Sequence, residues 1–538
     1  MNKSDKSIRL IATAIITILA ATVPFISSAD IGHQPVSEKC ESGRQTEDPN
    51  SPPCQPYFEG DNGGQTSPGV TGDEVRVLLY LNTAITVNGS DAEQSPPKGT
   101  YCDVDLLDCN GDGKPDADPH VYLRVANTLS RYFNARFQTY NRHVHFYAYY
   151  GADFPSTAQQ RAEAEDNYLH ISPFAVVDVG SLSSFKADYY DAMARHGVMV
   201  FSGVDTAAQS GLFFSKHAPY VWNWWPDAEH RADLYANYVC DKVKVTNVTE
   251  GPFAGQPRTY AIYTTADYSY PVEQLIGQLV RQKVQSCGIL IDNRDVFTYP
   301  HSGYLLEATA KDQAVAANNA LRMRRGNYNT VLYAGGSEAE ISKATERLGY
   351  LPQWIVLGDG KIDGGATGNA QGQIAWSHAW VVSNQSQVGA PEEQPGYRAY
   401  NEMEPNSQDA SWAPVYYAGF FMIFDAIQLA GPRLEPQSVD TGLHAIAPYQ
   451  STALDSPALF FDPGDYTFVK DALETWWDPL SFGESGSITG CYRVVPPRNT
   501  SSSWMSSTSS GLNGSEKDGH ELCSAYVGPT DVKAPLFS

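Results

Sequence analysis

Short apolar runs alternate with segments of helical periodicity along most of this chain, and residues 175–203 show the pattern most clearly. An apolar run, Ala175–Val179, ends at a glycine and a cluster of serines. A helical segment, Phe185–His196, follows, and a second apolar run, Val198–Phe201, ends at Ser202. This order predicts a βαβ unit whose strands end in small hydrogen-bonding residues. Such residues suit a ligand site, because ligands bind beyond the carboxyl ends of parallel strands, although serine and glycine also simply favour turns.

The alternation continues on both sides of this unit. Further strands are predicted near residues 75–81, 143–151, 259–264, 288–292, 330–333, 354–357 and 373–376. Helices are predicted near residues 122–133, 156–168, 227–243, 272–280, 307–323, 338–348, 412–429 and 466–477. Strict alternation of this kind predicts parallel α/β sheets. The units are too many for one small sheet, so we expect a break near residues 219–226 that divides them into two similar halves.

The first 29 residues have the pattern of a secretory signal. Three basic residues precede an apolar stretch, Leu10–Ile26, and the small residues 27–29 form a cleavage site before Asp30. The apolar stretch contains Pro24 and is slightly short for a membrane-spanning helix. We therefore expect an exported protein, periplasmic or extracellular, with an uncleaved membrane tether as the alternative. No later segment is predicted to cross a membrane.

The net charge excludes two classes of partner, and the length predicts more than one domain. The formal net charge is −24, and it becomes −26 once the signal, with three basic residues and one acidic residue, is removed. A surface this acidic repels nucleic acid and anionic lipid, so neither is an expected partner. The remaining chain of about 509 residues is too long for one core and predicts two or more domains.

Eight cysteines in an exported chain predict disulfides. Eight cysteines allow 105 pairings, and a preference for local closure favours neighbours along the chain. The predicted pairs are Cys40–Cys54, Cys102–Cys109, Cys240–Cys287 and Cys491–Cys523. Cys240 lies near the end of a predicted helix and Cys287 at the start of a predicted strand, two points that share one edge of a parallel sheet. The spacings do not match a zinc site.

Residues 108–116 carry the pattern of a calcium loop. Oxygen-bearing residues stand at positions 1, 3, 5 and 9, a glycine stands at position 6, and a backbone carbonyl is available at position 7. The ligands would be Asp108, Asn110, Asp112, Lys114 through its carbonyl, and Asp116. Pro119 stands in place of the glutamate usual at position 12, where Asp118 or Asp105 could substitute. No helix is predicted before the loop, so a full EF-hand is not expected. We expect a structural Ca²⁺ site, with a solvated turn closed by Cys102 and Cys109 as the alternative.

The sequence lacks the common catalytic patterns. The twelve histidines are scattered without ligand spacing, and no GxSxG element precedes a helix. The glycines near Lys361 lack the spacing of a phosphate-binding loop. We therefore do not expect an enzyme, and a secreted hydrolase is the least favoured alternative.

The order of these segments resembles the type I periplasmic solute-binding fold, specifically the branched-chain amino acid (Leu/Ile/Val) substrate-binding family of ABC transporters. The resemblance is carried by GVTGDEVRV at residues 69–77 and by the segments at 132–151, 176–203, 258–271, 329–336 and 354–360. Together these motifs cover about residues 69–480. The resemblance implies an α/β protein of two lobes, each a mostly parallel sheet flanked by helices, with a hinge between the lobes.

Resemblance and composition together divide the chain into six segments. These are the signal at 1–29, a Pro/Gly/Ser-rich leader at 30–70, lobe 1 at 71–222 with an insert at 87–118, lobe 2 at 223–372, a return to lobe 1 with the last hinge crossing at 373–483, and a Ser/Gly-rich tail at 484–538. We expect order to begin at residue 69, with an extended leader before it and a tail that is a surface extension.

The resemblance also implies a function. It implies a non-enzymatic, monomeric protein that captures a small polar ligand in the cleft between the lobes by hinge closure. An amino acid or amide is the default ligand, and an ABC permease in the membrane is the implied partner. The alternative is an extracellular ligand sensor that presents its closed form to a membrane receptor.

Candidate ligand-binding residues follow the predicted strands. Ser181 and Ser183 suit a carboxylate, because the N–H groups that begin the next helix are partly positive. Ser202 and Thr206 could complete that set. The resemblance adds three partners for a cationic group or a ring, namely Asp205, Tyr268 and Asp359. Asp359 stands between two glycines, and its alternative role is to form a turn.

Three tryptophans, Trp222, Trp224 and Trp225, stand at the expected lobe crossing. Aromatic rings at this place could close over an apolar or ring-bearing ligand. They could equally pack the hinge, and we favour packing.

Overall fold

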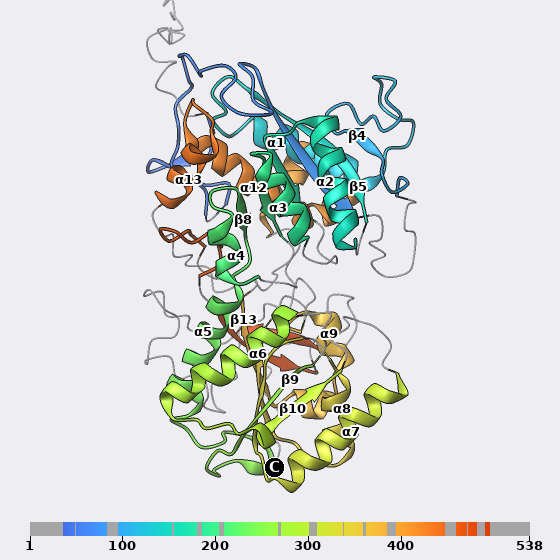
Figure 1. Ribbon diagram of the computed structural model, residues 1–538, viewed down its shortest axis with the longest axis vertical. Coiled ribbons are helices and arrows are strands. Elements are labelled where there is room, and N and C mark those ends of the chain that lie inside the picture. The colour runs from blue at the N-terminus through green and yellow to red at the C-terminus, as the bar shows by residue number, and fades with distance from the viewer. Residues whose placement is uncertain are drawn as a thin grey trace, which may run out of the picture.

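The computed structural model describes residues 36–48, 50–82, 95–152, 155–179, 186–203, 209–266, 271–300, 309–336, 338–358, 362–384, 394–446, 459–470, 472–480 and 490–494, and the structural statements below concern these. Two lobes lie one beyond the other along the long axis of the molecule (Figure 1). The predicted signal at 1–29 lies outside the described residues, as do all but a few residues of the predicted tail.

Lobe 1 is built on a six-stranded sheet. Its strands lie in the order β4 (Tyr101–Asp103), β5 (His143–Gly151), β3 (Glu74–Asn82), β6 (Ala175–Asp178), β7 (Met199–Ser202) and β8 (Val221–Asn223). Neighbouring strands are parallel except β4, which pairs antiparallel with β5. The apolar run of β3 is buried on both faces, as the near-continuous apolar strands of parallel sheets are.

Helices cover both faces of this sheet. They are α1 (Val121–Asn134), α2 (Thr157–Ile171), α3 (Ala187–Arg195), α4 (Gly211–Lys216), α11 (Pro395–Met403), α12 (Ala413–Ala430) and α13 (Pro436–His444). Helix α2 begins at a capping box formed by Ser156 and Gln159. Helix α12 packs on β6 and β7. A side chain at Gly419 would put its Cβ 2.6 Å from a methyl carbon of Val177, so this glycine allows the close approach.

Lobe 2 is built on a seven-stranded sheet. Its strands lie in the order β10 (Val296–Tyr299), β9 (Tyr260–Thr265), β11 (Thr330–Tyr333), β12 (Gln353–Leu357), β13 (Ala379–Ser383), β14 (Leu473–Asp478) and β15 (Cys491–Val494). The first five are parallel, and β14 and β15 extend the sheet antiparallel. The helices of this lobe are α5 (Ala228–Tyr238), α6 (Pro271–Val284), α7 (Ala310–Arg325), α8 (Glu340–Arg347), α9 (Gly365–Ala370) and α10 (Gln373–Trp376).

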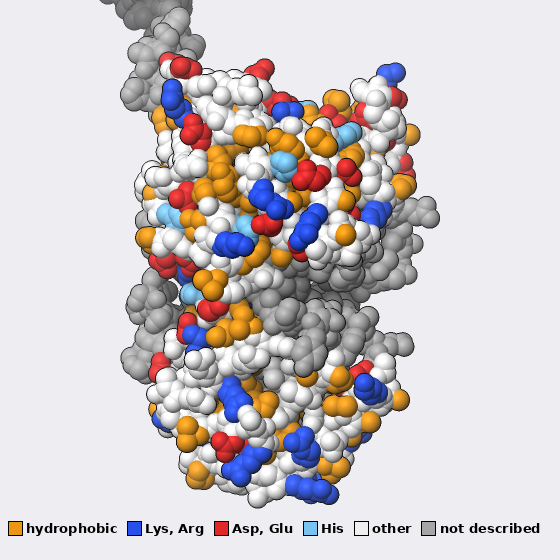
Figure 2. All heavy atoms as spheres, viewed as in Figure 1, with side chains coloured by type: hydrophobic (Ala, Val, Ile, Leu, Met, Phe, Trp, Pro, Cys, Tyr) orange, Lys and Arg blue, Asp and Glu red, His pale blue; other side chains and the backbone are white. Residues whose placement is uncertain are grey.

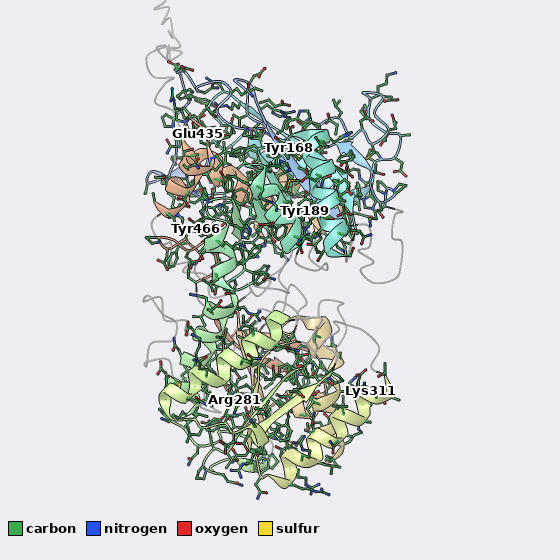
Figure 3. The ribbon with its side chains drawn as sticks, viewed as in Figure 1. Tyr168, Tyr189, Arg281, Lys311, Glu435 and Tyr466 are labelled. Atoms are coloured by element: carbon green, nitrogen blue, oxygen red, sulfur yellow. A yellow bond between two sulfur atoms is a disulfide. The ribbon has the colours of Figure 1, made fainter. Side chains whose placement is uncertain are left out.

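The chain crosses between the lobes three times. It leaves lobe 1 after β8 and leaves lobe 2 after β13, and the last crossing follows Thr467, which bridges Asn223 at the edge of the lobe 1 sheet. Tyr466, just before this crossing, still lies in lobe 1 (Figure 3). The lobes are therefore joined by three neighbouring segments, the arrangement that a hinge requires.

The predicted return to lobe 1 at residue 373 is wrong. Residues 373–376 form helix α10 instead of a strand, and the next strand, β13, still belongs to lobe 2. The predicted helix at 466–477 is also wrong, because Leu473–Asp478 forms β14, whose six residues are all buried. The strand predicted at 288–292 lies later, at β10. Runs this short fit a helix and a strand equally well by periodicity, and only sheet pairing decides between them.

The leader is not an extended segment before the fold, because its described residues pack on lobe 1. The Gln428 side chain in α12 donates hydrogen bonds to Gln45 Oε1 at 2.5 Å and to the carbonyl oxygen of Pro53 at 2.9 Å. The hydroxyls of Thr66 and Ser67 donate to the carbonyl oxygen of Leu434 at 2.6 and 2.8 Å. Order therefore begins well before residue 69.

Three predicted disulfides are confirmed. They join Cys40 to Cys54, Cys102 to Cys109 and Cys240 to Cys287, with Cα–Cα distances of 6.1, 4.0 and 5.8 Å. Cys491, the first residue of β15, is also disulfide-bonded, and its predicted partner Cys523 lies outside the described residues.

One helical stretch among the described residues, Gln408–Ala430, is long and apolar enough to cross a membrane by length and composition, contrary to our expectation. It contains α12, and 72% of its most apolar window is buried inside the molecule. The apolar residues of α12 are therefore accounted for by the core of lobe 1, because a buried core helix has the same composition as a membrane span. On the face drawn in Figure 2, acidic and basic side chains are interspersed over both lobes, so the negative net charge does not form one patch there.

Candidate functional site

The carboxyl ends of the parallel strands face the boundary between the lobes. Strand β8 is parallel to β7, and from its carboxyl end the chain passes directly into lobe 2. Strand β13 is parallel to β12, and from its carboxyl end the chain returns to lobe 1 (Figure 1). Open α/β sheets bind ligands at this edge. The interlobe side of the two sheets is therefore the candidate site.

Six of the seven predicted ligand-binding residues lie outside the described residues. They are Ser181, Ser183, Asp205, Thr206, Tyr268 and Asp359. Each follows the carboxyl end of a strand in the sequence, after β6, β7, β9 or β12. Their roles stay predictions.

Ser202 is the predicted ligand residue that the structure describes, and it is the last residue of β7. Its side chain is fully buried. Its hydroxyl lies 3.0 Å from the hydroxyl of Tyr190, within hydrogen-bond distance. Ser202 therefore anchors the end of β7 through Tyr190, and its role toward a ligand stays a prediction.

Asp178 and Lys186 form a buried ion pair that was not predicted from the sequence. Lys186 Nζ lies 2.8 Å from Asp178 Oδ2, and both side chains are fully buried. The Tyr190 hydroxyl donates to the same carboxylate oxygen at 2.7 Å, and the ammonium lies 4.4 Å from the ring centre of Tyr80. The signal available in the sequence was an acidic residue at the end of an apolar strand, followed by a lysine eight residues later. The pair joins the end of β6 to the residue that precedes α3, and Ser181 and Ser183 lie between these two points in the sequence.

A cavity of about 380 Å³ opens beside these strand ends. Its lining residues come from the ends of β6 and β7, the crossing after β8, the first turns of α12, the leader, and both later crossings. They are Asp48, Asn50, Val179, Gly203, Trp224, Trp225, Asn384, Pro414, Val415, Tyr417, Ala418, Phe421, Met422, Leu459, Phe468 and Val469. The volume lies within the range of about 300–1,000 Å³ typical of small-molecule sites, and the wall is mostly apolar, as such sites are.

One of the three tryptophans packs the crossing between the lobes, and the other two line the cavity. Trp222 is fully buried, and its ring lies 4.6 Å from that of Tyr466 and 4.9 Å from that of Phe461, so it packs the crossing as expected. Trp224 and Trp225 instead line the cavity. Trp225 Nε1 donates to the carbonyl oxygen of Gly203 at 3.2 Å. A Cβ at Gly203 would lie 1.5 Å from the Trp224 ring, so this position must be glycine for the ring to lie there.

The predicted calcium loop has a folded, self-bonded geometry. The Asp108 carboxylate accepts hydrogen bonds from three backbone N–H groups, the shortest from Gly113 at 2.7 Å. The Asn110 side-chain amide donates to Asp116 at 2.6 Å. Burial acts to raise the pKa of Asp108, but the backbone N–H donors outweigh it and lower the pKa. Within the described ranges, no three His, Cys, Asp or Glu side chains are grouped so that they could hold a metal, and calcium stays a prediction.

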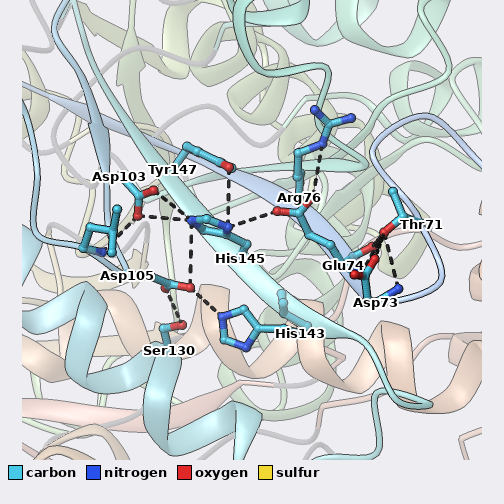
Figure 4. Close-up of polar contacts among 12 residues, drawn as sticks. Thr71, Asp73, Glu74, Arg76, Asp103, Asp105, Ser130, His143, His145 and Tyr147 are labelled. Carbon is cyan, nitrogen blue, oxygen red and sulfur yellow. Dashed lines mark hydrogen bonds and ion pairs between the residues drawn. The ribbon is translucent and has the colours of Figure 1, made fainter. Parts of the chain in front are cut away.

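A cluster of histidines and acids lies at the amino ends of β3 and β5, at the far end of the lobe 1 sheet from the cavity (Figure 4). His145 Nδ1 lies 3.0 Å from Glu74 Oε1, and His145 Nε2 lies 3.1 Å from both carboxylate oxygens of Asp103. His143 Nε2 lies 2.5 Å from Asp105 Oδ2. Burial acts to lower the pKa of His145, but the surrounding carboxylates outweigh it and raise the pKa above its ordinary value.

Comparison with known proteins gives matches at the level of structure. No family model and no curated protein sequence matches the chain. An ABC transporter substrate-binding protein from Aeropyrum pernix matches with a TM-score of 0.50 and 11% identity, over 78% of this chain and 95% of that chain. The branched-chain amino acid transporter substrate-binding protein LivJ from Streptococcus pneumoniae, in complex with isoleucine, matches with a TM-score of 0.48 and 13% identity, over 79% and 100%. A solute-binding protein of an ABC transporter from Rhodopseudomonas palustris, in complex with 3,4-dihydroxybenzoic acid, matches with a TM-score of 0.48 and 10% identity, over 78% and 95%.

At these identities the likeness concerns the fold. Two mostly parallel sheets joined by three crossings agree with the match to the Aeropyrum pernix protein. The predicted fold is confirmed: the chain has the two-lobed α/β fold of periplasmic solute-binding proteins of ABC transporters.

Proposed function

We propose that this chain is an exported solute-binding protein, which captures a small ligand between its lobes and delivers it to an ABC permease. The observation that carries the proposal is the cavity at the carboxyl edge of the sheets, which takes lining residues from all three crossings between the lobes. A ligand at this place contacts segments that move when the hinge closes, so its binding energy favours the closed form. The proposal contains no catalytic step.

The proposed ligand is small and has both a polar and an apolar part. An amino acid or amide remains the default, with its carboxylate at Ser181, Ser183 and the N–H groups that begin α3. Asp205, Thr206, Tyr268 and Asp359 are proposed to complete the polar contacts. The cavity supplies the apolar surface for the side chain of such a ligand.

A ligand screen on the mature chain tests this proposal. Amino acids, amides and small aromatic acids are added one at a time, and thermal unfolding and small-angle X-ray scattering are recorded together. A ligand at 100 times its Kd stabilises the folded state by about 2.7 kcal/mol. We expect at least one compound both to raise the melting temperature and to reduce the radius of gyration. Absence of any stabilising compound, or stabilisation without compaction, contradicts capture by lobe closure.

The double variant Ser181→Ala with Ser183→Ala then tests the carboxylate contact. A hydrogen bond to a charged group contributes about 1.5–3 kcal/mol, so we expect affinity to fall at least about tenfold while the melting temperature of the free protein is kept. Unchanged affinity moves the carboxylate site away from this segment. The gene neighbourhood separates transport from sensing: finding a permease gene and an ATPase gene beside this one would favour transport over a sensor role.

A further inference from the structure

The leader reaches the cavity, although it lies more than 100 residues before β6 and β7 in the sequence. Its 40–54 loop is closed by a disulfide and is bonded to α12 through Gln45 and Gln428. Within the loop, Asp48 Oδ1 accepts hydrogen bonds from the backbone N–H of Asn50 at 2.8 Å and from its side-chain amide at 3.2 Å. The backbone N–H of Asp48 donates to the Ser51 hydroxyl at 3.0 Å. Asp48 and Asn50 are therefore held in fixed positions in the cavity wall.

The polar end of the cavity has hydrogen-bonding capacity that the described residues leave unused. Asn50 and Tyr417 are each only 7% exposed. The side-chain oxygen of Asn50 and the hydroxyl of Tyr417 make no hydrogen bond with any residue that the structure describes. Burial raises the pKa of the Asp48 carboxyl group, and Asn50, the charge of Arg398 and the Tyr417 hydroxyl act in the opposite direction, so Tyr417 lies close to this carboxyl group. A buried polar atom without a partner costs free energy, which a bound donor recovers.

The composition of this end selects the kind of group that it accepts. Asp48 and Asn50 present acceptor oxygens, and the lining residues that the structure describes include no Lys, Arg or His. A second carboxylate would be repelled there, whereas an N–H donor, above all a cationic one, would be attracted. The lining also includes the rings of Trp224, Trp225 and Phe421 and the side chain of Met422, which suit an apolar body.

We infer that the cavity takes a compact apolar amine, with its nitrogen donating to Asp48 and Asn50 and its apolar body against Trp224 and Trp225. The inference rests on the proposed function, because it names the ligand class of that same site. It also gives the leader a role in specificity, since the leader supplies the acceptor groups of the cavity.

Three probes of similar size test the inference by isothermal titration of the disulfide-intact mature chain. They are 2-phenylethylamine, 2-phenylethanol and 3-phenylpropanoate, which carry an ammonium, a hydroxyl and a carboxylate on one kind of apolar body. We expect the amine to bind at least about tenfold more tightly than the alcohol, because hydrogen bonds to charged groups are the stronger ones, and the carboxylate to bind most weakly. Equal affinity for the three probes, or no binding of the amine, overturns the inference.

Two variants with matched controls locate the amine. Asp48→Asn keeps an oxygen that can accept the turn bonds but removes the charge, and we expect it to abolish the preference for the amine over the alcohol. Asp61→Asn, an exposed leader residue outside the cavity lining, is its control and should keep that preference. Tyr417→Phe removes the hydroxyl that has no hydrogen-bond partner among the described residues, and it should lower the affinity for the amine. Tyr416 is a buried neighbour on α12 outside the lining, and Tyr416→Phe should leave that affinity unchanged. Variants of Asp48 and Tyr417 that bind like their controls overturn the inference.

The outcome separates this inference from the proposed function. If another solute closes the lobes while the amine does not bind, the function stands and the ligand class is wrong. If the amine binds in an Asp48-dependent way while no solute compacts the protein, the cavity is a ligand site and capture by closure is wrong.

Discussion

Replacing Lys186 by Met should destabilise the protein strongly, because it leaves the Asp178 carboxylate buried without its cation. Both side chains of the pair are fully buried, and 2.8 Å separates their charged atoms. Tyr190 donates one hydrogen bond to the carboxylate, but a neutral donor does not replace an ammonium. Removing one partner of a buried ion pair costs about 3–5 kcal/mol. We expect the free energy of unfolding to fall by that amount in Lys186→Met.

Urea unfolding at pH 7 measures this change, and Lys39→Met provides the control. Lys39 lies 2.6 Å from Glu402, but the two side chains are 42% and 36% exposed, so the same substitution should cost less than about 1 kcal/mol there. The double variant Asp178→Asn with Lys186→Met removes both charges and should recover a large part of the loss. Equal destabilisation by Lys186→Met and Lys39→Met refutes the reasoning, because it means that the buried charge is compensated in some other way.

Further predictions concern the rest of lobe 1 and lobe 2. The pKa of His145 is raised in the folded state, so protonated His145 stabilises the fold below about pH 6.5, and this stabilisation is lost as the pH rises through the raised pKa. In His145→Gln, the free energy of unfolding in urea should no longer change with pH over that range. A pH profile unchanged from that of the wild-type chain contradicts the prediction. Calcium titration should give binding heat for the wild-type chain and none for Asp108→Ala with Asp112→Ala, and a wild-type chain that gives no heat removes the calcium prediction. Replacing Cys240 and Cys287 by Ser removes a disulfide that closes a loop of 47 residues, and the gain in chain entropy of the unfolded state should lower the free energy of unfolding by about 4 kcal/mol. Thermal unfolding of the exported protein measures this loss, and an unshifted melting temperature contradicts the prediction.

The sequence determined the features that rest on local pattern. Central strands such as β6 and β7 are buried along their whole length, so apolar runs such as Ala175–Val179 and Val198–Phe201 could be recognised one by one. Three disulfides could be predicted because each joins two consecutive cysteines of the chain. The alternation of strands and helices then implied parallel sheets, and the order of the motifs implied two lobes.

The tertiary structure alone decided the features that depend on pairing between distant segments. Strand β14 belongs to lobe 2 because Trp476 pairs with Trp380 on β13, about a hundred residues earlier, and no local periodicity encodes that pairing. The ion pair beneath the site joins two residues whose burial only the packed fold reveals. The leader forms part of the cavity wall because Asp48 and Asn50 line the same cavity as Tyr417, which lies more than 360 residues later in the sequence. Contacts of this kind depend on the three-dimensional path of the chain, whereas a sequence pattern reports only the neighbours of each residue.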